Sequence, residues 1–225
     1  MVFLCVFSPL AARAQDTVPG RPSAENEVMI ETLPVSVNMR AFGDTKTGSI
    51  STIGVEFVTH SRKIRYLPWY MFFSLAGPIS RSRVDATFGV FPLMLLHEAA
   101  DADQYGNPLS SAKKFVPGFG VTPLGIRFLW RESKPVRLYL NGKFGGELFT
   151  QPALAPDSTH FNVVAEANSG TQIKIAHNID LRVGFEYIHI CNFFLGKVNP
   201  GLDALGVNYG VSFHLPSRDK TPHVN

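Results

Sequence analysis

The sequence has few cysteines, few charged residues and no long apolar run, and each shortage excludes a class of protein. The chain has 225 residues, of which two are cysteines and 17% are charged, and its formal net charge is +3. Two cysteines and seven scattered histidines do not form a zinc-ribbon or iron–sulfur pattern, so we expect no structural metal. No block of Lys and Arg and no interleaved basic and aromatic stripe indicates binding to nucleic acid.

The first residues have the pattern of a secretory signal. An apolar run from Val2 to Ala12 precedes an Ala-x-Ala pattern that ends at Ala14. Cleavage there would remove Cys5 and leave Cys191 as the one cysteine of the exported chain, so no internal disulfide is expected. An exported protein with a single thiol needs an explanation for that thiol.

After this segment, no stretch approaches the ~18 consecutive apolar residues that a membrane-spanning helix needs. Barrel strands cross a bilayer with only ~9–11 residues each and alternate apolar with polar side chains, so this shortage does not exclude a membrane barrel. Turn-forming residues at 43–48, 101–110 and 133–135 separate extended segments. Strands are predicted at 33–43, 50–60, 84–97, 119–131, 136–149, 159–168, 180–191 and 203–215.

The strand pattern predicts an all-β fold, an eight-stranded antiparallel up-and-down transmembrane β-barrel, because single-chain bacterial barrels have even strand numbers. We divide the chain into a signal peptide at 1–14, a leader at 15–32, the barrel at 33–215 and a tail at 216–225. The aromatic stretch at 62–77 fits either a strand extension or an aromatic belt.

Alternation is clearest at 136–149, where successive strand side chains point to opposite faces. One face carries Val136, Leu138, Leu140, Phe144 and Leu148, and the other carries Arg137, Asn141, Lys143 and Glu147. A soluble β-sandwich also alternates, but the signal, the aromatic content and the small polar inner set favour the barrel.

Polar residues with catalytic potential gather on the outer face of the last two strands. In the segment from Leu181, the odd positions are apolar and continue to His189 and Cys191, which places both on the lipid side. Asp203 lies on the odd, apolar face of the final strand. Because a short loop joins these strands, the three residues lie near one end of an antiparallel pair, and ionisable groups in such a place are functional candidates.

This set suits acyl transfer, in which a nucleophile is deprotonated by an imidazole that a carboxylate orients. We assign Cys191 as nucleophile, His189 as general base and Asp203 as the group that fixes the imidazole tautomer. The amides of Asn192 and Asn199 are candidate hydrogen-bond donors to the oxyanion. The alternative is that His189 and Asp203 anchor the barrel at the headgroup level while Cys191 packs as a small apolar residue.

The segment HICNFFLGKVNPGLD at 189–203 resembles the signature of the lipid A 3-O-deacylase family, in which His-x-Ser-Asn is followed by an Asn and an acidic residue. GFGVTPLGIRFLW from Gly118, the glycine-bearing strand at 141–146 and FNVVAEANSG from Phe161 are similar to exported barrels described as acyloxyacyl hydrolases.

The resemblance implies an outer-membrane barrel that removes the ester-linked 3-acyl chain of lipid A without a cofactor. Its partner is then lipid A, or lipopolysaccharide, in the outer leaflet, and a homodimer through the lipid face stays open. By the same resemblance His189 is the base, Asp203 the acidic partner, and Asn192 and Asn199 the oxyanion donors.

Two positions depart from the family pattern. Cys191 stands where the family has Ser, and Asp203 is one methylene shorter than the Glu of well-described members. Three hypotheses follow: an esterase that uses Cys191, a catalytically silent structural or lipid-binding barrel of the same ancestry, and a small pore. Because eight strands enclose an interior that side chains fill, the barrel geometry argues against the pore.

Overall fold

Alternating side chains determine which segments form strands and which face of each strand is buried. The computed structural model describes residues 26–60 and 82–215. Its strands are β1 (Asn26–Leu33), β2 (Ser36–Asn38), β3 (Ser49–His60), β4 (Arg83–Ala99), β5 (Lys113–Trp130), β6 (Val136–Phe149), β7 (Phe161–Lys174), β8 (Ile179–Cys191) and β9 (Leu202–Leu215).

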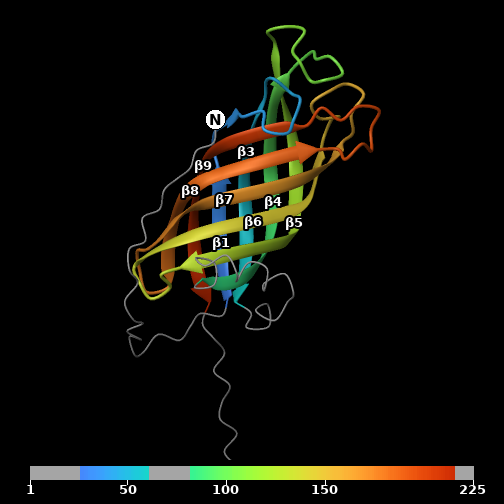
Figure 1. Ribbon diagram of the computed structural model, residues 1–225. Helices are drawn as coiled ribbons and strands as arrows, with labels where there is room; N and C mark the ends of the chain where they lie inside the picture. Colours follow the sequence, from blue (N-terminus) through green and yellow to red (C-terminus); the bar gives the residue numbers. More distant parts are fainter. Residues whose placement is uncertain (1–25, 61–81, 216–225) are drawn as a thin grey trace, which may run out of the picture.

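The strands form one closed antiparallel barrel (Figure 1). From β3 to β9 each strand pairs with the next along the chain, β1 pairs with β3, and β9 returns to pair with both β1 and β2. In the described part of the chain, β1 and β2 both pair with β9 and together form one wall position of the barrel, which we call the first stave. The nine strands therefore make an eight-strand barrel. The eight-stranded antiparallel fold class is therefore confirmed.

A bulge separates the two halves of the first stave. Thr32 is opposite Tyr209, but Ser36 is opposite Gly206, so one extra residue lies on the side that contains Pro34. Ser36 then exchanges hydrogen bonds with the backbone of Ile50, its Oγ donating to the carbonyl at 2.7 Å and accepting from the amide at 2.8 Å. A side chain thus replaces ladder bonds where the strand bends.

The predicted start of the barrel was wrong. The first strand was expected at 33–43 after a leader at 15–32, but β1 already begins at Asn26. Glu27 and Glu31 lie in the segment assigned to the leader, yet both side chains are buried in the lumen. An acidic residue at every fourth position is compatible with a strand when the inner face of the barrel is charged.

The other predicted strands agree with the structure within a few residues, except that β5 begins at Lys113 and β7 extends to Lys174. The aromatic stretch at 62–77, the signal peptide and the tail at 216–225 lie outside the described residues. Within the described ranges, no helix is long and apolar enough to cross a membrane.

Paired charges fill the lumen nearest the chain ends. Arg127 donates to Glu27 at 2.8 Å and to Asp85 at 2.7 Å, and all three side chains are fully buried. Lys143 lies 2.7 Å from Glu31 and 2.6 Å from Glu166. Burying such charges is favourable only when each is paired and hydrogen-bonded, so these contacts hold the two sides of the barrel in register.

An apolar layer fills the lumen nearer the opposite end, where loops 39–48, 100–112, 150–160 and 192–201 connect the strands (Figure 1). It includes Leu33, Phe91, Met94, Leu96, Val116, Phe149, Val164, Ile188, Ile190 and Leu202. Side chains thus occupy the described barrel at both levels, as expected for eight strands. A filled interior of this kind argues against the pore hypothesis.

Removal of the central arginine tests the charge network. Arg127→Ala leaves Glu27 and Asp85 as buried carboxylates without their main partner, which should lower the free energy of unfolding by about 3–5 kcal/mol. Urea titration, followed by the mobility shift of the folded barrel on a gel, measures this loss. Lys134→Ala, at an exposed position in the β5–β6 turn, should change stability by no more than ~0.5 kcal/mol. Equal stability of the two variants would contradict the role of the network.

Candidate active site

The candidate site begins with three side chains in a row on the outer face of β8. Tyr187, His189 and Cys191 are partly exposed, whereas Ile188 and Ile190 between them are buried in the apolar layer of the lumen. This is the face that alternation predicted for His189 and Cys191. The two inward isoleucines pack against the apolar layer directly behind the polar side chains.

Strand register brings the imidazole and the carboxylate together. His189 of β8 is directly opposite Asp203 of β9 in the antiparallel ladder. Their side chains meet at 2.7 Å, from Nδ1 of the histidine to Oδ1 of the aspartate. With Nδ1 held by the carboxylate, Nε2 is the ring nitrogen available for proton transfer, which is the arrangement that a general base needs.

Asp203 is almost completely buried, with 1% of its surface exposed, although it lies on the outer side of the wall. Its Oδ2 accepts hydrogen bonds from the backbone amides of Phe42 at 2.5 Å and Gly43 at 2.7 Å. Its Oδ1 accepts a second hydrogen bond from the Tyr187 hydroxyl at 2.5 Å. These donors compensate the cost of removing the carboxylate from water.

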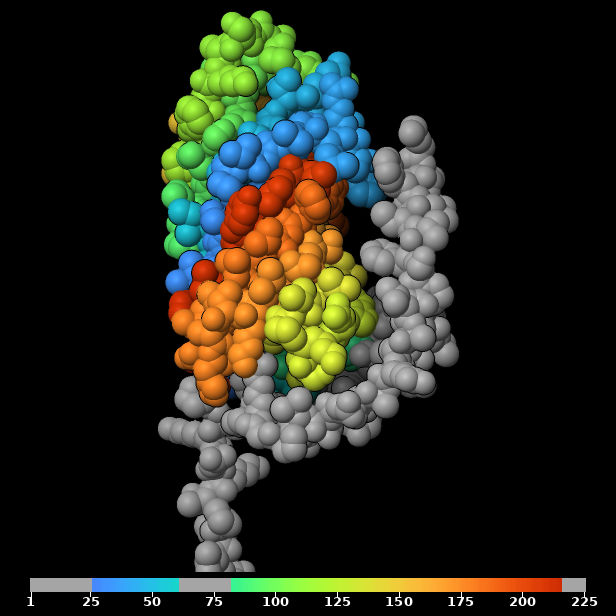
Figure 2. All heavy atoms as spheres, turned by 90° about the vertical axis from the view of Figure 1, so that its left-hand side faces the viewer, coloured from blue at the N-terminus to red at the C-terminus, as the bar shows by residue number. Residues whose placement is uncertain are grey.

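Sequence reasoning missed these three donors. Tyr187 shares the odd face of β8 with His189, so the same alternation could have identified it. The amides of Phe42 and Gly43 left no comparable signal, because any residue supplies a backbone N–H. In Figure 2 the first segments of the barrel (blue) lie against β9 (red) on the face turned to the viewer.

Cys191 lies on the same face, at the end of β8, and is a half-buried free thiol. Its ladder partner is Val163 of β7, on the side of β8 away from Asp203. Within residues 26–60 and 82–215, no hydrogen bond joins its Sγ to His189. Alternate residues of a strand are separated by roughly 6.5 Å along its axis, and catalytic hydrogen bonds often tighten only when substrate binds.

Asn192 organises the adjoining loop. Its Nδ2 donates to Ser158 Oγ at 2.9 Å and to the Val198 carbonyl at 2.6 Å, and its Oδ1 accepts from the Phe194 amide at 3.0 Å. The Asn199 side chain accepts a bond from the Asn192 backbone amide at 2.9 Å. The structure thus brings the two predicted oxyanion residues to each other, with both Nδ2 hydrogens of Asn192 already used.

An apolar rim surrounds the polar groups. Phe193 and Phe194 have left-handed backbone φ angles of 53° and 62°, and their side chains are 67% and 83% exposed. Phe42, also 82% exposed, lies edge-on to the His189 ring with centroids 6.1 Å apart. Non-glycine residues in this conformation cost of order 1–3 kcal/mol each and cluster at functional sites. The site therefore combines a polar centre with an apolar surround.

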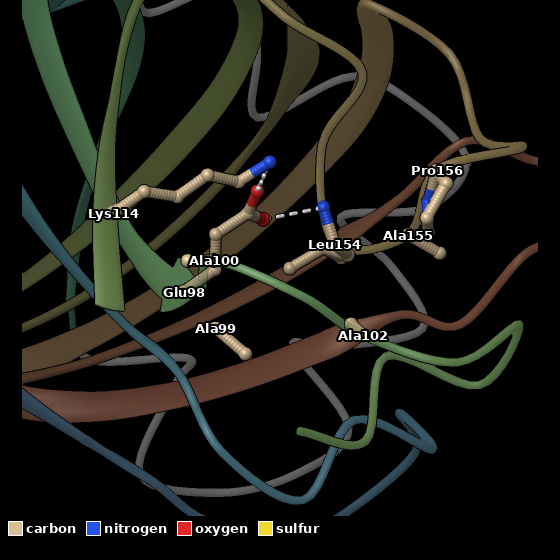
Figure 3. Close-up of a pocket in the computed structure, with 8 residues that line it drawn as sticks. All are labelled: Glu98, Ala99, Ala100, Ala102, Lys114, Leu154, Ala155 and Pro156. Carbon is tan, nitrogen blue, oxygen red and sulfur yellow. Dashed lines mark hydrogen bonds and ion pairs between the residues drawn. The ribbon is translucent and has the colours of Figure 1, made fainter. Parts of the chain in front are cut away.

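A small cavity of about 20 Å³ lies at the same end of the barrel (Figure 3). At its wall, the Glu98 carboxylate accepts a hydrogen bond from the Leu154 amide at 2.5 Å and forms an ion pair with Lys114 at 3.1 Å. This volume is enough for about one water molecule and not for a substrate. The cavity marks where loop 150–160, which carries Ser158, is fastened to the β4–β5 hairpin.

Comparison with known proteins places these observations in a family. A family model described as lipid A 3-O-deacylase (PagL) matches residues 83–212, which is more than half of the chain. The crystal structure of the outer membrane enzyme PagL is similar at a TM-score of 0.51 and 13% identity, covering 82% of this chain and 97% of that one. Neisserial surface protein A is similar at a TM-score of 0.45 and 11% identity, covering 85% and 97%. No curated protein matches the chain.

The hydrogen bonds of Asn192 predict that this loop is sensitive to a single-atom change. Asn192→Asp places an oxygen where Nδ2 donates to the Val198 carbonyl, so two donors are lost and two acceptors face each other. We expect loop 192–201 to be cleaved at least about tenfold faster in limited proteolysis, since removing a buried partner costs about 1–3 kcal/mol. Ser158→Ala, which removes one of these bonds, should have a smaller effect. Protection equal to wild type in Asn192→Asp would contradict this role.

Proposed function

The chain belongs to the lipid A 3-O-deacylase (PagL) family, and from this premise we propose that it hydrolyses the ester-linked 3-acyl chain of lipid A. The observation that carries the proposal is the His189–Asp203 pair on the outer face of the barrel, with Cys191 next along that face. An acyl-transfer site on the outside of a filled barrel suits a substrate that lies in the surrounding lipid.

The outer wall supports a membrane location. Large apolar side chains point outward on every side of the barrel, among them Ile30, Ile53, Phe57, Phe88, Leu93, Phe119, Leu124, Leu138, Phe144, Phe161, Phe185 and Tyr209. A polar lumen inside an apolar wall is the arrangement of outer-membrane barrels. We infer that the protein is exported through its N-terminal signal and inserted in the outer membrane.

The direction of the strands supports a position of the site in the outer leaflet. Asn26 pairs with Leu215, so both ends of the described barrel lie at one rim, and His189, Cys191 and Asp203 lie toward the other. With both chain ends on the periplasmic side, the site meets the outer leaflet, where lipopolysaccharide is located. Whether two barrels associate through this wall is a separate prediction, which cross-linking in membranes tests.

The proposed chemistry assigns one role to each of the three groups. His189 Nε2 takes the thiol proton while Cys191 Sγ attacks the ester carbonyl carbon. The tetrahedral intermediate collapses, the carbon–oxygen bond to the sugar breaks, and the imidazolium returns the proton to the leaving alkoxide. Water, deprotonated by His189, then attacks the thioester and releases the fatty acid and the thiol. Asp203 holds the Nδ1–H and stabilises the imidazolium in both steps.

The oxyanion of each intermediate needs donors. Asn199 is the more available of the two predicted amides, because within the described ranges its Nδ2 has no hydrogen-bond partner. Asn192 can contribute only by exchanging the bonds that it makes to Ser158 and Val198. Loss of one such donor costs ~100–1,000-fold in rate, so the two amides are distinguishable by kinetics.

One observation favours a second candidate, a silent barrel of the same family. The nucleophile position holds a thiol in place of the family serine, and within the described residues Cys191 makes no hydrogen bond to His189. A thiol is larger and more acidic than a hydroxyl, so a site shaped for one can serve the other poorly. The silent barrel would keep the fold and the lipid contact without turnover.

Mass spectrometry of lipid A separates these candidates. Expression in a Gram-negative host should yield lipid A that lacks one 3-hydroxyacyl chain, and Cys191→Ala should abolish this loss because no nucleophile remains. His189→Gln, which removes the base, should reduce it at least about 100-fold. Val207→Ala, on the outer face of β9 and outside the site, is the matched control and should deacylate like wild type.

The serine variant decides between the two candidates. Deacylation by wild type that disappears in Cys191→Ala supports the thiol enzyme. Intact lipid A with wild type but deacylation with Cys191→Ser shows that the framework is competent and the native nucleophile is not. Intact lipid A in every variant, with each barrel folded in the membrane, overturns the proposed deacylase and supports the silent barrel.

A further inference from the structure

The Asp203 carboxylate is restrained far more than a pairing with His189 requires. Besides the imidazole, it accepts two backbone N–H bonds on Oδ2 and one phenolic O–H bond on Oδ1. Hydrogen bonds to an ionised carboxylate are shorter and roughly twice as strong as those between neutral groups. Four donors on one nearly inaccessible side chain therefore form a cradle with a defined orientation.

The amide half of this cradle comes from the loop after β2. Three backbone hydrogen bonds join that loop to the segment that ends at Asp203. The Met39 amide donates to the Asp203 carbonyl at 3.0 Å, the Asp44 amide to the Pro200 carbonyl at 2.7 Å, and the Thr45 amide to the Gly201 carbonyl at 3.2 Å. Residues 39–45 thus lie along residues 200–203 as an irregular loop. The loop is held in place by pairing that does not depend on the carboxylate.

Two glycines permit this approach. A Cβ added to Gly43 would lie 2.6 Å from the carbonyl oxygen of Gly201 and 2.9 Å from the amide nitrogen of Leu202, which is closer than real Cβ contacts. Gly201 itself has a φ of 58°, in the left-handed region that favours glycine. Any side chain at position 43 must push the loop away from Asp203, together with its two N–H donors.

We propose that Tyr187 and the Phe42–Gly43 backbone amides are positioning groups of the active site, which fix the Asp203 carboxylate so that Oδ1 meets His189 Nδ1. The inference rests on the proposed function and extends it beyond the family match, because residues 42 and 43 lie outside the matched range 83–212. None of the three touches the reacting atoms. They act through Asp203.

The physical argument concerns rotation of the carboxylate. An aspartate that pairs only with a histidine can turn about its Cβ–Cγ bond and present either oxygen at a range of angles. Here two amides hold Oδ2 and the phenol approaches Oδ1 beside the imidazole, so a single orientation satisfies all donors. The imidazole then has one tautomer and one ring orientation before the substrate arrives, which is how a site avoids reorganisation during the reaction.

Tyr187→Phe tests the phenol. The variant keeps the ring and removes one donor to Oδ1, so the His189 Nδ1–H resonance should shift and broaden in spectra of ¹⁵N-histidine-labelled barrel in detergent micelles. His189→Gln assigns that resonance by its loss. The deacylation rate constant kcat should fall about tenfold with KM unchanged, as expected for a charged hydrogen bond that acts on the transition state. Tyr209→Phe is the control, since Tyr209 lies exposed on β9 and its hydroxyl makes no hydrogen bond within the described residues.

Gly43→Ala tests the amides by displacing the loop. It should alter the same resonance and lower kcat by at least about tenfold, because two donors leave together. Gly142→Ala is its control, since a Cβ there meets nothing closer than 4.0 Å. The gel mobility shift of folded barrels checks that every variant has folded.

The spectra and the rates together decide. A changed His189 resonance and a lower kcat in both Tyr187→Phe and Gly43→Ala, with both controls like wild type, support the proposal. An unchanged resonance in folded Tyr187→Phe overturns it, whatever the rate does, and so does full activity of a variant whose resonance has changed. If wild type has no deacylase activity, the proposed function fails while the resonance still decides whether these groups position Asp203 and His189.

Discussion

The antiparallel ladder between β9 and the first stave is the interaction on which the rest of the structure depends. It closes the sheet, so in the described barrel β1 is paired with a strand on each side and its edges are not open to other chains. It also carries the loop after β2 to the outside of β9, where its amides meet Asp203. Without this closure, the carboxylate would lie at an exposed edge and lose two of its donors. The same strand pairing therefore closes the barrel and completes the surroundings of Asp203.

The lumen has two levels, a charged one that stabilises the barrel and an apolar one that supports the proposed site. Paired charges centred on Arg127 and Lys143 lie toward the chain ends, and an apolar layer lies beneath the site. Ile188 and Ile190 alternate with His189, so the strand that presents the imidazole outward also packs the layer inward. A rigid backing of this kind holds the imidazole without help from the substrate. The proposed reaction needs no passage through the barrel, in agreement with a lumen that side chains fill.

Alternation predicted the regular parts of the molecule and could not predict the rest. The bounds of β6 and the outward side of His189 and Cys191 follow from a period of two residues, which the backbone imposes. β1 was misread because Glu27 and Glu31 are polar residues on an inner face, where charge is permitted by partners distant in sequence. Asn192 illustrates a second limit. It follows the outward-facing Cys191, so alternation predicts that its side chain points inward. Its hydrogen bond to Ser158 depends on a loop conformation that no periodicity encodes.

The cysteine at the proposed nucleophile position is best understood from what the surrounding framework retains. The His189–Asp203 pair and the donors of the carboxylate are all present, although maintaining them requires a buried charge and two close glycines. A barrel that only occupied the membrane would gain little stability from such an arrangement, because an apolar pair in the same space is often as stable. The cradle around Asp203 therefore favours a site whose proton transfer still matters. In that setting a thiol is a coherent nucleophile, since it needs less activation by the imidazole than a hydroxyl does.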